Sequence, residues 1–275
     1  MLKKLYGNKV IFILSVLLLM GCSNFNKIVK STDYEFKYKK AVEYYQDKDY
    51  SHASSMLKEL VNVYRGTSTA DDVYFYYAKS LFEQKDYIMA CHWFRTLLDE
   101  FSESEHAEES QFMVGYCYYL QSPSPRLDQS ATYKTIDAFH LFINLYPASK
   151  QKTKAEGYIN ELRNKLVYKS YLTGKLYFDF GNYKAAVIAL TNSLKDYPGT
   201  KYREDLMFML LKAKYLLAIN SVEEKKEQRL SNALDEYFAF VDEFPKSKNK
   251  KDAANYYKVL AKSLNYKSED NLDTK

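Results

Sequence analysis

Residues 78–104, AKSLFEQKDYIMACHWFRTLLDEFSES, carry the pattern that decides the fold. A small residue, Ala78, precedes the turn-like phrase Gln84-Lys-Asp-Tyr87, a second small residue, Ala90, follows it, and the aromatic Phe101 ends the unit. Apolar residues on both sides of the turn recur at i, i+3 and i+4, as amphipathic helices require. The stretch therefore predicts two helices that cross closely at the two small residues.

The same unit recurs five times along the chain. The small residue before the turn is Ala41, Ala78, Gly115, Gly174 and Ala213, and the small position after it holds Ala53, Ala90, Thr135, Ala186 and Ala233. Each unit closes on an aromatic residue followed three positions later by a hydroxyl, at Tyr64 and Thr67, Phe101 and Ser104, Tyr146 and Ser149, Tyr197 and Thr200, and Phe244 and Ser247. Proline follows three of these aromatic residues and cannot continue a helix. We expect the hydroxyl to N-cap the next helix.

The composition excludes several classes of protein. Glycine (8) and proline (5) are too scarce for the many turns of an all-β fold, and 47% hydrophobic residues argue against disorder throughout. The balance of 40 basic to 35 acidic residues is too even for a nucleic-acid partner. The sequence holds no phosphate loop, nucleophile elbow or zinc-protease motif, so we expect neither an enzyme nor a cofactor. No two histidines have the spacing of metal ligands, such as i and i+4. The four histidines are His52, His92, His106 and His140.

The first 21 residues are built as an export signal. Lys3, Lys4 and Lys9 precede an uncharged run over residues 10–20, which is too short to span a bilayer. Leu19-Met20-Gly21-Cys22 follows and resembles the lipobox of bacterial lipoproteins. That resemblance implies cleavage after Gly21 and acylation of Cys22, whereas the alternative is an uncleaved anchor with a chance cysteine. Ser23, in place of an aspartate, favours the outer membrane, and the lack of a following acidic run favours its periplasmic leaflet.

The repeats resemble the tetratricopeptide family. An all-α solenoid of about five helix pairs is implied over residues 33–266, with a lipidated linker at 22–32 and a disordered tail at 267–275. The stretch 151–180 fits one extended helix or an extra turn plus a helix. The run at 223–227 is expected to form an exposed loop or a short helix.

Together, the lipobox, the repeat number and the turns after Tyr146, Tyr197 and Phe244 resemble the BamD family of outer-membrane β-barrel assembly lipoproteins. In that family the C-terminal repeats dock on the barrel protein BamA, and the N-terminal repeats are implicated in receiving unfolded barrel precursors. The resemblance implies the same partners here, but no contact residue can be carried over. The alternative is another envelope lipoprotein of this fold, one that organises peptidoglycan or glycan-uptake complexes.

Two ladders of aromatic residues flank the small residue that precedes each turn. Members seven apart share one face of a helix, and they are Tyr38 and Tyr45, Phe75 and Phe82, Phe112 and Tyr119, and Tyr171 and Phe178. These positions tend to face the concave groove of a tetratricopeptide solenoid, so the ladders are a candidate peptide-binding groove. The alternative is that the rings pack between adjacent repeats.

Two further features leave alternatives open. Cys91 and Cys117 either form a disulfide between neighbouring helices or remain two half-buried thiols. The lysines of the last turn, Lys246, Lys248, Lys250 and Lys251, are either a solvated face or a contact for anionic head groups or an acidic partner.

Overall fold

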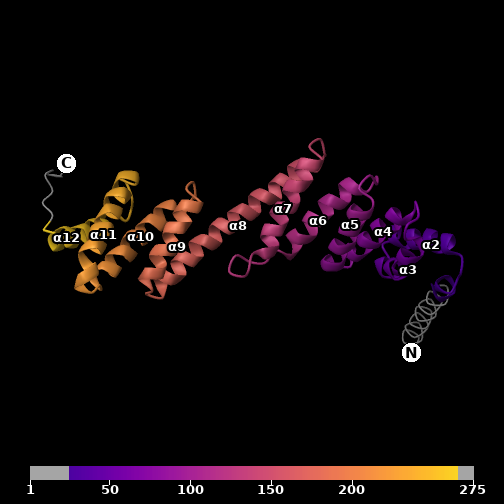
Figure 1. Cartoon of the computed structure of the whole chain (residues 1–275), viewed down its shortest axis with the longest axis horizontal. Helices are drawn as coiled ribbons and strands as arrows, with labels where there is room; N and C mark the ends of the chain where they lie inside the picture. Colours follow the sequence, from indigo (N-terminus) through magenta and orange to yellow (C-terminus); the bar gives the residue numbers. More distant parts are fainter. Residues whose placement is uncertain (1–24, 266–275) are drawn as a thin grey trace, which may run out of the picture. The chain divides into compact units, whose positions relative to one another are not determined.

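The computed structural model describes residues 25–265, and all regular secondary structure in this range is helical (Figure 1). The prediction of an all-α repeat fold is confirmed. The elements are α2 (Tyr34–Gln46), α3 (Tyr50–Tyr64), α4 (Ala70–Glu83), α5 (Tyr87–Glu100), α6 (Ala107–Gln121), α7 (Ser130–Leu145), α8 (Lys152–Asp179), α9 (Tyr183–Asp196), α10 (Arg203–Ile219), α11 (Glu223–Glu243) and α12 (Lys250–Ser263). The signal peptide, Cys22 and the tail lie outside the described residues, so those assignments stay predictions.

The described helices divide into two compact units. The first contains α2 to α7 and residues 152–160 of α8, and the second contains residues 124–127, the rest of α8 and α9 to α12. Helix α8 is a single helix of 28 residues, which decides between the two expectations for residues 151–180. The run at 223–227 begins the 21-residue helix α11 rather than forming a loop of its own.

The predicted linker contains a short helical segment at residues 25–29. The Phe25 ring lies 4.0 Å from the His52 ring and 5.9 Å from the Tyr44 ring, measured between centroids. This end of the linker is therefore packed on the first helix pair and does not extend away from it.

The small residues occupy the crossings where the sequence predicts them. All ten are buried, and the aliphatic ones before and after the turns, such as Ala41, Ala78 and Ala90, are 0% exposed. At Gly174 a Cβ atom would lie 2.5 Å from a methyl carbon of Leu190, which leaves no room for a side chain. Close approach of paired helices therefore explains why small residues recur at these positions.

The turns inside three helix pairs share one construction. Asp49, Asp86 and Asn182 accept a hydrogen bond from the backbone N–H three residues later and so cap α3, α5 and α9. The residue before each cap has a positive φ, at Lys48 (64°), Lys85 (66°) and Gly181 (72°). Two lysines thus adopt a conformation that glycine would adopt at lower cost.

The turns that close the helix pairs differ from the expectation. Each hydroxyl accepts a hydrogen bond from the N–H two residues later, and the acceptors are Thr67, Ser104, Ser149, Thr200 and Ser247. Where an N-cap is defined, it is the later residue, such as His106 or Tyr202, and not the hydroxyl. The prediction of a hydroxyl N-cap was wrong by two residues, because a tight turn separates the hydroxyl from the helix.

Candidate peptide-binding surface

The ladder positions fall into two groups by burial. Phe75 and Phe112 are only 7% and 3% exposed and belong to the core of the first unit. Phe75 stacks on His106 at 4.0 Å, and Phe112 contacts Phe139 and Phe142, each at 5.4 Å. Phe75 thus packs between repeats, which was the alternative expectation, whereas Phe112 packs within its own helix pair. A buried ring has little surface to offer a ligand.

The other six ladder residues are half-buried, and they are Tyr38, Tyr45, Phe82, Tyr119, Tyr171 and Phe178. Tyr38 lies 6.1 Å from Tyr64, and burial raises its pKa, with smaller contributions from nearby Asp72 and Asp71. Burial likewise raises the pKa of Tyr45 to about 12. The phenols are therefore neutral near pH 7 and available as hydrogen-bond donors.

Three tyrosines missed by the sequence analysis link these rings across the first unit. Tyr45 of α2 contacts Tyr76 of α4 at 5.4 Å, and Phe82 of α4 contacts Tyr116 of α6 at 5.7 Å. Tyr119 of α6 contacts Tyr158 of α8 at 4.3 Å. We name these half-buried residues the aromatic row: Tyr45, Tyr76, Phe82, Tyr116, Tyr119 and Tyr158. The row crosses α2, α4, α6 and α8, which are the first helices of four successive repeats.

Charged side chains border the aromatic row. Lys154 places its Nζ over Phe112, Tyr116 and Tyr158, at 5.4 to 5.9 Å from the ring centroids. Lys79 of α4 pairs with Glu109 of α6 at 2.8 Å. The row therefore combines stacked apolar faces, phenol hydroxyls and an exposed cation, a set that suits an extended peptide with aromatic side chains.

The remaining ladder residues lie in the second unit. Tyr171 stacks on Tyr202 at 4.6 Å, and Tyr168 contacts both rings. Phe178 contacts Tyr183 at 6.0 Å, and Lys212 lies 5.5 Å above its ring. These rings also pack between repeats while keeping partial exposure.

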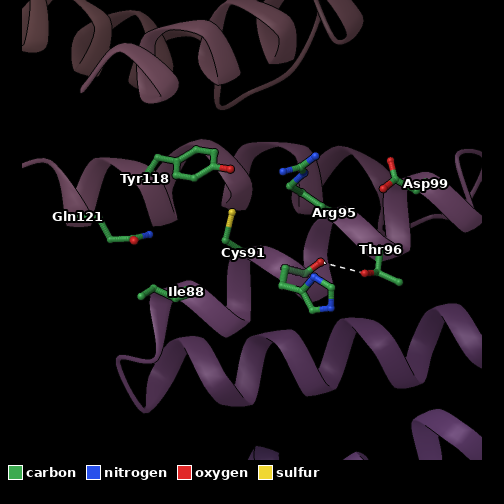
Figure 2. A pocket seen from close by; sticks show the side chains of 8 residues that line it. Ile88, Cys91, Arg95, Thr96, Asp99, Tyr118 and Gln121 are labelled. Atoms are coloured by element: carbon green, nitrogen blue, oxygen red, sulfur yellow. Dashed lines mark hydrogen bonds between the residues drawn. The ribbon is translucent and has the colours of Figure 1, made fainter. Parts of the chain in front are cut away.

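A separate cavity of about 340 Å³ lies between α5 and α6 (Figure 2). The Cys91 sulfur points into it, between the Tyr118 ring and the Arg95 side chain. Tyr118 and Arg95 both act to lower the pKa of the Cys91 thiol, but burial is the larger effect. Burial raises the pKa of the Cys91 thiol, so this sulfur is not set up as a nucleophile. Cys91 and Cys117 are both free thiols.

One cluster of the described residues brings metal-ligating atoms together. Atoms of Asp72, Glu105 and His106 lie within 4.8 Å of one another, and His106 Nε2 lies 2.8 Å from Asp72 Oδ1. Sequence spacing could not reveal this group, because Asp72 and His106 come from different repeats. The pair links α4 to the start of α6, where His106 also stacks on Phe75.

Within residues 25–265, no helix combines the length and the apolar character needed to cross a membrane. The fold and its repeated turns define a tetratricopeptide-like helical repeat protein. A family model described as "YfiO: Outer membrane lipoprotein" matches residues 31–230. The chain therefore belongs to the YfiO outer membrane lipoprotein family.

One relative in sequence agrees with this assignment. The chain is 26% identical over 250 residues to a putative outer membrane protein assembly factor BamD of Aquifex aeolicus (strain VF5), covering 90% of this chain and 81% of that protein. Among solved structures, the TPR2AB domain of yeast Sti1 in its pHSP90 complex is similar with a TM-score of 0.38 and 14% identity, over 83% of this chain and 98% of that one. The Naa15/Naa10 complex bound to HypK-THB gives a TM-score of 0.33 and 17% identity, over 87% of this chain and 40% of that one.

Proposed function

We propose that this protein is a lipid-anchored scaffold of the outer-membrane β-barrel assembly machinery. Membership of an outer membrane lipoprotein family and the BamD relative support this class of function. Acyl chains on Cys22 hold the protein on the periplasmic leaflet, since several chains anchor stably where one is marginal. The protein performs no chemistry and acts by raising the local concentration of its partners.

The aromatic row is the proposed surface for unfolded barrel precursors. Strands of a membrane barrel alternate apolar and polar side chains and carry aromatic girdles at both interfaces. An extended strand can stack its aromatic side chains on the aromatic row. Lys154 lies beside the rings and can pair with a carboxylate of the bound strand. The observation that carries this proposal is the unbroken series of ring contacts from Phe82 through Tyr116 and Tyr119 to Tyr158, with the Tyr45–Tyr76 pair on the two preceding first helices. The C-terminal repeats then dock on a BamA-like barrel protein.

Peptide binding tests the row. A labelled peptide copied from the last strand of an outer-membrane barrel is titrated with the chain, and binding is followed by fluorescence polarisation. Changing Tyr76→Ala and Tyr116→Ala together should weaken binding by about tenfold to a hundredfold, as the loss of two aromatic contacts predicts. Tyr133→Ala is the matched control, because Tyr133 is 54% exposed on α7, outside the row. Equal affinity of the folded double variant and the control would reject the row as the peptide site.

Co-purification tests the scaffold. A mild-detergent pull-down from outer membranes, using the wild-type signal and a C-terminal tag, should recover a BamA-like barrel in stoichiometric amount. A Cys22→Ala variant should lose membrane attachment. Recovery of the anchored protein with peptidoglycan or glycan-uptake proteins and without that barrel would support the alternative scaffold instead.

A further inference from the structure

A side-chain hydrogen bond recurs at three of the junctions that close the repeats. The serine of the closing turn donates its hydroxyl proton to an acid in the first turn of the first helix of the repeat that it closes. The pairs, which we name the junction bonds, are Ser104 with Asp71 at 2.7 Å, Ser149 with Glu108 at 2.6 Å, and Ser247 with Glu204 at 2.7 Å. The partners are 33 to 43 residues apart in sequence, so each bond ties the turn from which the next repeat begins to the start of the helix pair that it closes.

Hydrogen bonds within each closing turn fix the orientation of its serine or threonine hydroxyl. In every closing turn the hydroxyl oxygen accepts an N–H from two residues ahead, at 3.1 Å for Ser104 and 3.2 Å for Thr200. The backbone bonds also match, since the N–H of Ser104 and that of Thr200 each bind the closing aromatic residue's carbonyl at 3.1 Å. The oxygen of Thr200 is thus held as that of Ser104 is, with its proton free to be donated.

The fourth junction lacks the acid. Residues 70–104 and 166–200 align without a gap, because Ala78 matches Gly174 and Asp86 matches Asn182, and Ser104 matches Thr200. This alignment places Val167 where Asp71 stands. The packing beside it is retained, because Tyr202 stacks on Tyr171 as His106 stacks on Phe75.

A cavity of about 410 Å³ lies at this junction, within the second unit. It is lined by Asn164, Val167, Tyr197, Gly199, Thr200, Lys201 and Tyr202, and none of these is acidic. Among the described residues, no acceptor lies at hydrogen-bond distance for the Thr200 proton. The first junction also lacks an acid, since Tyr34 matches Asp71, but there Thr67 donates to its own turn, to the Tyr64 carbonyl at 2.7 Å.

Lys201 adds a positive charge to the same cavity. Its Nζ lies 5.2 Å from the Tyr202 ring centroid, and its side chain is exposed. We propose that this cavity binds an aspartate or glutamate side chain of a partner protein, which takes the place of the missing junction acid. Thr200 donates to that carboxylate and Lys201 pairs with it. The inference rests on the turn geometry and does not depend on precursor binding at the aromatic row.

Restoring the acid within the chain is the first test. Val167→Glu places a carboxylate at the position of Asp71, so it should form a junction bond with Thr200 and pair with Lys201. Relative to the isosteric Val167→Gln, the Tm of the second unit should rise by about 2–4 °C, and Thr200→Ala should remove the larger part of that gain. Equal Tm values for the Glu and Gln variants would overturn the proposal, because the cavity would then not favour a carboxylate.

Zero-length cross-linking is the second test. A carbodiimide joins a lysine amine to a carboxylate in direct contact, so isolated outer membranes containing the full-length protein are treated and the linked peptides are sequenced. Lys201 should be joined to an aspartate or glutamate side chain of another protein, and Val167→Glu should abolish the link. Lys248 is the matched control, because it follows Ser247 in the same turn at a junction whose acid, Glu204, is present.

Three results of the cross-linking would contradict the proposal. They are a Lys201 link confined to its own chain, a link to another protein that is equally frequent at Lys248, and a link to a chain's terminal carboxylate. The last result would assign the cavity to a peptide end and not to a side chain of a folded partner.

Discussion

A Cβ atom at Gly115 would lie 2.7 Å from two ring carbons of Phe139. Phe139 is fully buried on α7, and its ring also contacts Phe112 and Tyr158, each at 5.4 Å. The ring is therefore surrounded and cannot move aside at low cost. Glycine at 115 is required by the packing of α6 on α7 and not by backbone conformation.

Gly115→Ala should lower the free energy of unfolding by about 1–3 kcal/mol, although alanine is the better helix former. Denaturant unfolding monitored by circular dichroism gives this value. Gly157→Ala is the control, because Gly157 is exposed in α8 with no atom within 4 Å of a Cβ there. Gly157→Ala should raise the free energy of unfolding by about 0.5–1 kcal/mol. Two changes of the same sign would contradict the packing argument.

Lys85→Gly should stabilise the first unit. Lys85 has φ +66°, in the left-handed region that costs a residue with a side chain about 1–2 kcal/mol, and glycine avoids this cost while losing more entropy on folding. We expect a net gain of about 0.5–1 kcal/mol in the free energy of unfolding, measured by urea titration. Lys58→Gly, in the middle of α3, should lose about 1 kcal/mol by the same measurement. A loss at both positions would show that the Lys85 side chain makes a contribution larger than its backbone cost.

The sequence predicts the helix pairs well because steric demands repeat with the chain. A small residue at each crossing and an aromatic residue at each helix end are local requirements, and both are visible as spacing. How deeply an aromatic ring is buried is not determined by the residues near it in sequence. Phe75 and Tyr38 hold matching ladder positions, yet Phe75 is buried and Tyr38 is half-buried, because burial depends on the neighbouring helices.

The aromatic row and the junction bonds escaped the sequence for a related reason. Tyr76, Tyr116 and Tyr158 occupy different positions in their repeats, so no period marks them, and their contacts arise only across successive repeats. The bond from Ser104 to Asp71 likewise joins residues whose side-chain directions are set by the turn and by the stacking of repeats. Such contacts can be recognised only after the helices are placed.

The pair formed by Glu243 and Arg203 makes part of the stability depend on pH. Arg203 Nη2 donates to Glu243 Oε2 at 2.9 Å, and this bond holds the carboxyl pKa below its ordinary value. Because the pKa is lower in the folded state, the stabilisation is present above the unfolded pKa, about 4.3, and is lost as pH falls through the folded pKa. The Tm difference between wild type and Glu243→Gln should therefore shrink from about pH 5 to pH 3.

The pH experiment has an internal control. In an Arg203→Gln background the same Glu243→Gln change should produce a Tm difference that varies much less with pH, because the cause of the lowered pKa has been removed. An unchanged pH dependence in that background would assign the effect to another group. High salt should also reduce the difference, since both side chains are partly exposed.

Native Cys91 and Cys117 should react slowly with thiol reagents. Burial raises the pKa of both thiols, and only the thiolate is nucleophilic. Iodoacetamide at about pH 8 should leave both unmodified in the folded chain and modify both in denaturant, as intact-mass measurement will show. Cys117 should be the slower of the two, because it is 0% exposed, whereas Cys91 faces a cavity. A native mass two protons lower, without added reagent, would instead reveal a disulfide.

Phe112 and Tyr116 should separate folding from binding. Phe112 is 3% exposed between Phe139 and Phe142, so Phe112→Ala should cost about 3–5 kcal/mol of unfolding free energy through the cavity it leaves. Tyr116 is half-buried in the aromatic row. Tyr116→Ala should therefore cost less stability than Phe112→Ala, but it should weaken binding of the barrel-derived peptide by about tenfold. Denaturant titration and fluorescence polarisation on the same samples compare the two, at a temperature where Phe112→Ala is still folded. If folded Phe112→Ala loses more affinity than Tyr116→Ala, the ligand reaches the core ring, and the ladder would then be the better description of the site than the row.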